Sequence, residues 1–211
     1  MDNKVKGMVQ TVLGLKPPSD LGITLTHEHL LIDLTCYFRM PEEATAKAIV
    51  DKPITMEMLG SLRQHFYHSR DAQTMFDEQL AIEEILKYKY AGGQSIVDTT
   101  SIGIARDPLA LARISRATGL NIIMGGSYYV IDSHPKDMSN RTEDSITEQI
   151  IKDVTIGVGD TGVKTGVIGE IGNYYPIGEN ETKILRASAH AQAETGAPIL
   201  IHPGIHPDSP L

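Results

Sequence analysis

The chain has 211 residues, of which 41% are hydrophobic and 22% are charged, a composition typical of a globular domain with one sizeable core. A net charge of -8 without a basic stripe argues against nucleic acid or an anionic membrane as a partner. The single cysteine, Cys36, excludes an internal disulfide, and we see no apolar run that predicts a signal peptide or a transmembrane segment. We therefore expect a cytoplasmic protein with one domain over residues 1–211.

The first elements lead to a pair of histidines. A short strand or hairpin is predicted over residues 8–15, and a β-branched strand over residues 21–25 runs into Thr26-His27-Glu28-His29. Side chains of a strand alternate between its faces, so His27 and His29 point to one side and Glu28 to the other. Two imidazoles on one side can hold a divalent metal ion such as zinc. The alternative is two unrelated polar residues at a strand exit.

The rest of the chain alternates helical and extended segments. Further strands are predicted over residues 95–99, 121–124, 166–169 and 198–201. An irregular stretch is predicted over residues 30–53, and helices from about 55 past 66, over 76–91, from 107 to 119, from 145 onward and over 181–194.

Local signals mark several helix ends. Asp107 before Pro108 predicts an N-cap with proline in the first turn, and Gly119 and Gly196 predict C-terminal ends. Ser145-Ile146-Thr147-Glu148 has the capping-box pattern. Glu83 and Lys87, four residues apart, predict an ion pair on the helix over residues 76–91.

This alternation indicates an α/β protein with a parallel sheet and right-handed crossovers. A (β/α)8 barrel and a doubly wound sheet both fit. Polar side chains at the carboxyl ends of the strands favour the barrel, because barrel active sites are built there. They are His27, His29, Asp98, Glu170 and His202. No Gly-rich phosphate turn follows the first strand, as a doubly wound fold would have. We predict a TIM-type (β/α)8 barrel with only about the first five β/α units present.

Four of these residues form a candidate metal site: His27, His29, Glu170 and His202. The two oxygens of Glu170 could bridge two divalent ions roughly 3.5–4 Å apart. A water held between such ions becomes a hydroxide nucleophile near neutral pH. The structural alternatives are a strand-end Glu170 paired with a lysine, and a His202 that only marks a strand exit.

Other polar residues are weaker candidates. Asp98 is expected to hydrogen-bond around the ligands or to cap the following turn. Tyr128 is expected to line the pocket, with core packing as the alternative. Cys36 has no adjacent base in the sequence, so we do not expect it to act as a nucleophile. The histidines that are not expected to be ligands are His65, His68, His134, His190 and His206.

Four motifs follow one another in the chain: Leu25–His29, Ile96–Asp98 with Gly103–Asp107, Gly166–Gly172, and Ile201–Gly204. Together they resemble the phosphotriesterase family of the amidohydrolase superfamily, in particular its phosphotriesterase-related branch. The resemblance implies a β/α barrel with two divalent metal ions, usually zinc. It implies that His27 and His29 bind one ion, that His202 binds the other, and that Glu170 bridges both.

The resemblance also implies a reaction, and this sequence departs from the family pattern at two points. Glu170 stands where bacterial phosphotriesterases have a carboxylated lysine, which favours a small ester or an N-acyl amide such as N-acetyltaurine over a phosphotriester. The family's strand-six histidine and strand-eight aspartate have no counterpart here, so no side chain is assigned as catalytic beside the metal-bound water. The alternative is a catalytically inactive truncated isoform or a partner-binding fragment. The expected partner is a small-molecule substrate, and a homo-oligomer is left open.

Overall fold

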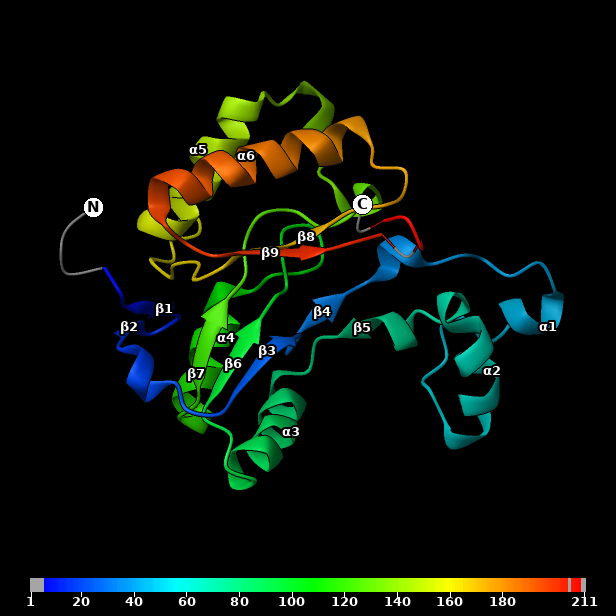
Figure 1. The fold of residues 1–211 in the computed structure, drawn as a ribbon. Coiled ribbons are helices and arrows are strands. Elements are labelled where there is room, and N and C mark those ends of the chain that lie inside the picture. Colours follow the sequence, from blue (N-terminus) through cyan, green and yellow to red (C-terminus); the bar gives the residue numbers. More distant parts are fainter. Residues whose placement is uncertain (1–5, 205, 210–211) are drawn as a thin grey trace.

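Parallel strands form the centre of the molecule (Figure 1). The computed structural model describes residues 6–204 and 206–209. Its parallel strands are β3 (Thr24–Glu28), β6 (Ser95–Asp98), β7 (Asn121–Met124), β8 (Ile168–Gly172) and β9 (Ile199–His202). β3, β6 and β7 pair in that order, β8 pairs with β9, and a parallel bridge between Gly125 and Val167 links the two sheets. The predicted parallel α/β sheet is confirmed, and the strands of the described residues do not close into a barrel.

Helices connect these strands and pack on them. The helices are α1 (Ala44–Lys47), α2 (Leu59–His65), α3 (Glu78–Tyr90), α4 (Pro108–Thr118), α5 (Glu143–Thr155) and α6 (Glu179–Thr195). α5 packs on α6 beside β8 and β9, and α3 packs on α4 beside β6 and β7 (Figure 1). None of the helices described has both the length and the apolar character needed to cross a membrane.

Four short strands lie outside the parallel sheets. β1 (Val9–Thr11) and β2 (Gly14–Lys16) form the predicted N-terminal hairpin, which contacts β7. β4 (Ile32–Asp33) pairs with β5 (Thr74–Met75) and lies beyond the carboxyl end of β3. Between β4 and β5 the chain leaves the sheet and forms α1 and α2 (Figure 1).

Two of the predicted strands begin too early in the sequence. The ladder of β3 begins at Thr24 because Gly22, with a φ of 55°, turns the chain before the strand. The ladder between β8 and β9 begins at Ile168 rather than at residue 166. As a result, His27 and Glu170 lie inside β3 and β8 rather than at the strand ends predicted for them.

The structure confirms most helix ends. Asp107 caps α4 through its side chain, and Gly119 and Gly196 adopt φ values of 70° and 71° at the ends of α4 and α6. The predicted capping box at Ser145 is wrong. α5 begins earlier, because the hydroxyl of Thr142 accepts the backbone N–H of Ser145 and makes Thr142 the N-cap.

The ion pair predicted on α3 is also wrong. Lys87 pairs with Glu84, and Glu83 accepts a hydrogen bond from Gln79 instead. These are exposed contacts on one face of a helix, where alternative pairings differ little in free energy.

Candidate metal centre

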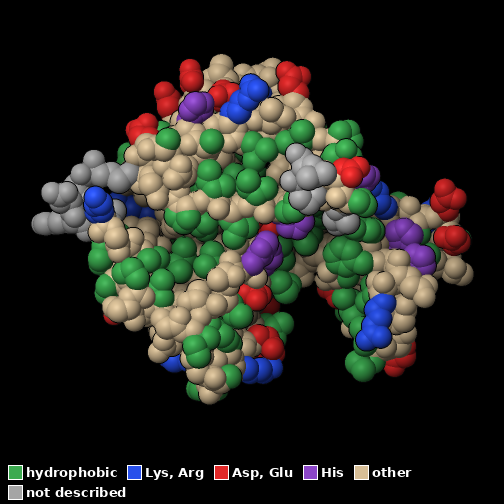
Figure 2. All heavy atoms as spheres, in the orientation of Figure 1, with side chains coloured by type: hydrophobic (Ala, Val, Ile, Leu, Met, Phe, Trp, Pro, Cys, Tyr) green, Lys and Arg blue, Asp and Glu red, His purple; other side chains and the backbone are tan. Residues whose placement is uncertain are grey.

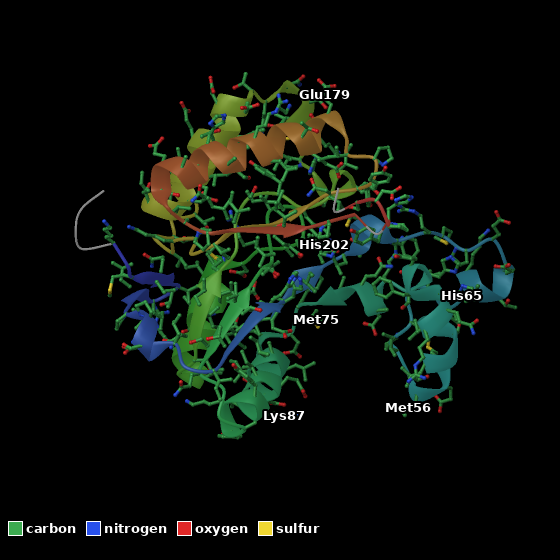
Figure 3. All side chains as sticks on the ribbon, in the orientation of Figure 1. Met56, His65, Met75, Lys87, Glu179 and His202 are labelled. Carbon is green, nitrogen blue, oxygen red and sulfur yellow. The ribbon has the colours of Figure 1, made fainter. Side chains whose placement is uncertain are left out.

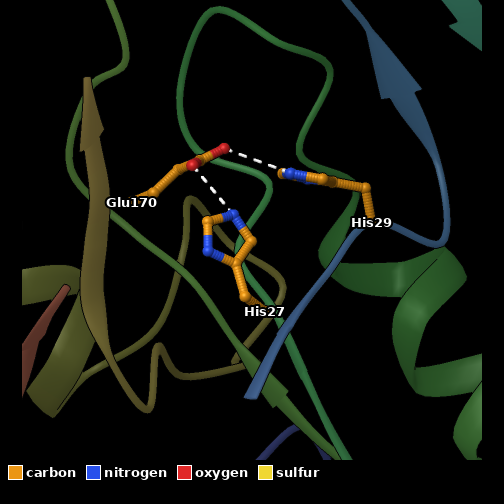
Figure 4. A group of neighbouring side chains, drawn as sticks. All are labelled: His27, His29 and Glu170. Atoms are coloured by element: carbon orange, nitrogen blue, oxygen red, sulfur yellow. Dashed lines mark ion pairs between the residues drawn. The ribbon is translucent and has the colours of Figure 1, made fainter. Parts of the chain in front are cut away.

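Three of the predicted ligands meet at the carboxyl ends of β3 and β8 (Figure 4). Nε2 of His27 lies 3.0 Å from Oε2 of Glu170, and Nε2 of His29 lies 3.1 Å from Oε1. Each residue offers one ligand atom, and these atoms all lie within 4.8 Å of one another. Two imidazoles and a carboxylate at this separation are a donor set that suits a divalent metal ion.

The backbone of Thr99 explains why these side chains converge. Its N–H donates to the carbonyl of Glu28 at 2.9 Å, and its carbonyl accepts the N–H of Glu170 at 3.1 Å. Neighbouring strands lie about 4.8 Å apart, so the backbones of Glu28 and Glu170 are held roughly 10 Å apart on either side of Thr99. Side chains that point inward from both sides can meet across that distance.

Close strand packing fixes the position of Glu170. A Cβ atom on the preceding residue, Gly169, would lie 2.2 Å from the carbonyl oxygen of Leu200 on β9, so only glycine lets the two strands approach this closely. The Glu170 side chain is 2% exposed, compared with 42% for His27. A carboxylate this deeply buried needs positive or hydrogen-bonding partners.

Hydrogen bonds set the tautomer of His29. Thr100 donates its hydroxyl proton to the carbonyl of Leu31 at 3.1 Å, so its oxygen accepts from Nδ1–H of His29 at 3.0 Å. In the neutral ring, the lone pair of Nε2 then faces Oε1 of Glu170. Two lone pairs at this distance repel unless a cation, either a metal ion or the proton of an imidazolium, lies between them. The arrangement therefore fits a metal ion, with Thr100 orienting the ligand.

Asp98 holds the backbone on both sides of this histidine–threonine contact. Its buried carboxylate accepts the backbone N–H of Leu30 at 2.8 Å and that of Thr100 at 3.1 Å. Burial raises the pKa of Asp98, and the two N–H donors oppose that rise. Asp98 thus ties the residue after His29 to the turn after β6.

His202 stands beside the cluster. Its ring centroid lies 6.3 Å from that of His27 and 5.5 Å from that of Tyr129. Nδ1 of His202 and Oε2 of Glu170 are buried and have no hydrogen-bond partner among the described residues. Both atoms are available as ligands, although His202 lies outside the group of donor atoms within 4.8 Å.

A cavity of about 550 Å³ opens beside His202. Its lining includes Leu34, Tyr37, Arg39, Phe66, Tyr67, Tyr129, Asp132, Asn173, Tyr174, Tyr175, His202, Pro203 and Gly204. Figure 2 shows histidine side chains near the centre of this face, next to hydrophobic ones. The metal cluster and the cavity thus share one end of the sheet.

Tyr128 does not line this cavity. It is buried in the core against α5 and α6, and its hydroxyl accepts a hydrogen bond from Arg141 at 2.8 Å. The neighbouring Tyr129 lines the cavity instead. The side chains of adjacent residues point in different directions, and the sequence did not indicate which of the two tyrosines faced the site.

Sequence reasoning also missed Arg39, Tyr37, Asp132 and Tyr174, all of which line the cavity. They lie on segments that follow the strands, and no motif marks them. The available signal was their position, because the loops after the strands of a parallel β/α fold carry substrate contacts.

The remaining histidines lie outside the cluster. His190 pairs with Glu143 at 3.1 Å on the surface. His65 and His68 stack on each other with ring centroids 5.4 Å apart, and Figure 3 shows His65 on α2, away from His202. His134 lies 2.8 Å from the carbonyl of Tyr129. Cys36 is half-buried, and desolvation raises its pKa to about 11, which disfavours the thiolate.

Comparison with known proteins gives the chain a family and a set of longer relatives. A sequence model of the phosphotriesterase family matches residues 7–211. The chain is 40% identical to an N-acetyltaurine hydrolase of Tetraodon nigroviridis, over 99% of this chain and 60% of that protein. It is 44% identical to a phosphotriesterase-related protein of Nematostella vectensis, over 97% of this chain and 59% of that protein.

A solved structure agrees with this placement. The crystal structure of a resiniferatoxin-binding protein from Rhodobacter sphaeroides superposes with a TM-score of 0.90 and 39% sequence identity. The alignment covers 93% of this chain and 55% of that one. Against the two curated relatives named above, the chain spans about 60% of their length.

Proposed function

The chain belongs to the phosphotriesterase family, and on that premise we propose that the protein containing it is a metal-dependent hydrolase of a small amide or ester. The observation that supports this most directly is the contact of Glu170 with both His27 and His29. The two histidines come from the end of β3 and the carboxylate from β8, and one ligand atom of each lies within 4.8 Å of the others.

The ligand roles follow from the donor atoms. His27 and His29 would hold one divalent ion, His202 would hold a second, and the two oxygens of Glu170 would contact both. Zinc suits this set of imidazoles and a carboxylate. Such ions polarise a scissile carbonyl and lower the pKa of a bound water. Thr100 holds the ring of His29 in place, and Asp98 fixes the two backbone segments beside it.

An N-acyl amide such as N-acetyltaurine is the substrate class we favour over a phosphotriester. Several relatives at 37–41% identity carry the name N-acetyltaurine hydrolase. Glu170 stands at the bridging position in place of a carboxylated lysine, in keeping with the phosphotriesterase-related branch. The cavity beside His202 has the size of a small-molecule site.

We also propose that the five parallel strands are an arc of a (β/α)8 barrel. The outer strands carry exposed apolar side chains, with Leu25 of β3 at 36% and Ile201 of β9 at 50%. Outer strands of this kind pair readily with further strands, which a complete barrel supplies. The family match and the high structural similarity to a longer relative support this arrangement.

The test uses the full-length natural protein that contains this sequence. We expect hydrolysis of N-acetyltaurine, at least about 100-fold weaker in Glu170→Gln because the ligand set is broken. Glu143→Gln is the matched control, since it alters the surface contact of Glu143 with His190. Triester hydrolysis without amide hydrolysis would overturn the substrate class. Absence of both, in folded and metal-loaded protein, would favour the non-catalytic alternative.

A further inference from the structure

The cavity beside His202 contains one strong cation. Arg39 is the only lysine or arginine among the described residues that line it. Most of the other lining residues are aromatic or apolar, and the one acidic residue is Asp132. A guanidinium within a largely apolar lining is a specific site for an anionic group.

Arg39 is held in place with part of its hydrogen-bonding capacity free. Nη1 donates to the carbonyls of Cys36 at 3.2 Å and Phe38 at 3.0 Å, and Nη2 donates to Asp132 at 3.2 Å. A guanidinium has five N–H groups, so these three bonds leave two without a partner among the described residues. Two free N–H groups can bind two oxygens of one anion.

The contact with Asp132 does not block this role. The Arg39 and Asp132 side chains are 59% and 41% exposed, and an exposed pair of this kind has only a small free energy of interaction. Asp132 also accepts the hydroxyl of Tyr174 at 3.0 Å, so its carboxylate stays partnered if Arg39 turns toward a ligand.

A row of tyrosines joins Arg39 to the metal cluster. Tyr129 lies against His202, with ring centroids 5.5 Å apart, and Tyr37 lies 6.1 Å from Tyr129 and 6.4 Å from Tyr174. Tyr174 in turn contacts the carboxylate that holds Arg39. One wall of the cavity therefore runs from the candidate ligand His202 to the cation.

We propose that Arg39 binds an anionic group at the far end of the substrate from the bond that is cleaved. This inference rests on the proposed function and assigns Arg39 as the residue that determines substrate specificity. The group recognised is a sulfonate or a carboxylate, since both offer oxygens to the free N–H groups of Arg39. The tyrosine wall contacts the atoms between that group and the reacting end.

The experiment compares Arg39→Gln with wild type in the full-length natural protein. The substrates are N-acetyltaurine, N-acetyl-β-alanine and the neutral N-propylacetamide. We expect Arg39→Gln to lower the preference in kcat/KM for the anionic amides over the neutral one by about 10- to 100-fold, mostly through KM. Arg39→Lys should restore part of that preference. A larger effect on one anionic amide identifies whether sulfonate or carboxylate is the better fit.

The control is Arg113→Gln, which removes a similar exposed arginine–carboxylate pair with Glu78 outside the cavity. It should leave the preference unchanged. An equal loss on all three substrates in Arg39→Gln, or no loss, would overturn the inference.

Binding measurements separate this result from failure of the proposed function. If wild type hydrolyses none of the amides, calorimetric titration of N-acetyltaurine and N-propylacetamide into the same proteins still tests Arg39. Tighter binding of the anion, lost in Arg39→Gln, would support the inference, and equal binding of the two compounds would contradict it.

Discussion

Nε2 of His29 lies 3.1 Å from Oε1 of Glu170, although β3 and β8 share no backbone pairing. The backbone of Thr99 lies between the ends of these two strands. In a flat sheet, inward side chains on strands that are not neighbours would run side by side, so the contact of His29 with Glu170 shows that the sheet curves toward this point. The curvature brings donors from separate strands together, as the end of a barrel does.

Glu170→Gln tests the central ligand. In the proposed centre both oxygens of Glu170 contact metal, so we expect replacement of one of them to lower the metal content per chain by at least about tenfold at limiting metal. Elemental analysis of purified protein measures this. Glu143→Gln should retain the wild-type content, and equal loss in both variants would point to unfolding instead.

His202→Ala separates the two proposed ions. In the proposed centre, His27 and His29 hold one ion and His202 holds the other, so His202→Ala should lower the metal content from about two equivalents to about one. His27→Ala should weaken the other ion instead, because it removes the contact with Glu170. Metal titration followed by calorimetry resolves the two steps. A single equivalent in wild type, unaffected by His202→Ala, would exclude His202 as a ligand.

The sequence predicted the elements and the cluster better than the cavity. His27, His29 and Glu170 could be predicted from the sequence because each ends or follows a β-rich segment. The ends of parallel strands meet at one edge of the sheet. Tyr129 rather than Tyr128 lines the cavity. This depends on how the backbone turns after β7, which the sequence of two adjacent tyrosines does not reveal. Arg39 and Asp132 come together through loops 93 residues apart in the chain, a contact that periodicity cannot reveal.

The start of α5 shows the same limit at the local level. Thr142 and Ser145 are both good N-caps, and sequence alone does not rank them. The structure selects Thr142, and Ile146 and Ile150 of the helix that follows are buried in the core.

The buried pair of Arg106 and Asp153 should contribute strongly to stability. Their side chains are 7% and 3% exposed, and Gln149 donates to the second carboxylate oxygen at 2.7 Å. Asp153→Asn leaves a buried guanidinium uncompensated, so the free energy of unfolding should fall by about 3–5 kcal/mol. Denaturant unfolding measures the change. Asp137→Asn, which breaks the exposed pair with Arg141, should have a much smaller effect.

Cys36 should react slowly as a thiol at pH 8. Burial raises its pKa to about 11, so the folded protein holds the thiol proton more tightly than the unfolded chain does. We expect reaction with a disulfide reagent to be about tenfold slower or more in folded than in unfolded protein, and to accelerate as the pH rises toward 11. A rate that is flat between pH 8 and pH 10 would contradict the raised pKa.

The raised pKa of Cys36 also predicts how the stability of the fold changes with pH. The protonated thiol is neutral, and folding disfavours the thiolate, so stability is fully present below the pKa of the unfolded thiol and falls as the pH rises above it. Cys36→Ser should flatten this alkaline loss in thermal unfolding scans. The same loss in Cys36→Ser would assign it to other groups.

The central claim is that His27, His29, Glu170 and His202 form a metal centre that supports hydrolysis. The most direct measurement is the hydrolysis of N-acetyltaurine by the full-length protein before chelation, after removal of metal, and after addition of zinc. We expect loss of activity on chelation, recovery with zinc, and no recovery in Glu170→Gln. Full activity in protein shown by elemental analysis to contain no metal would contradict it.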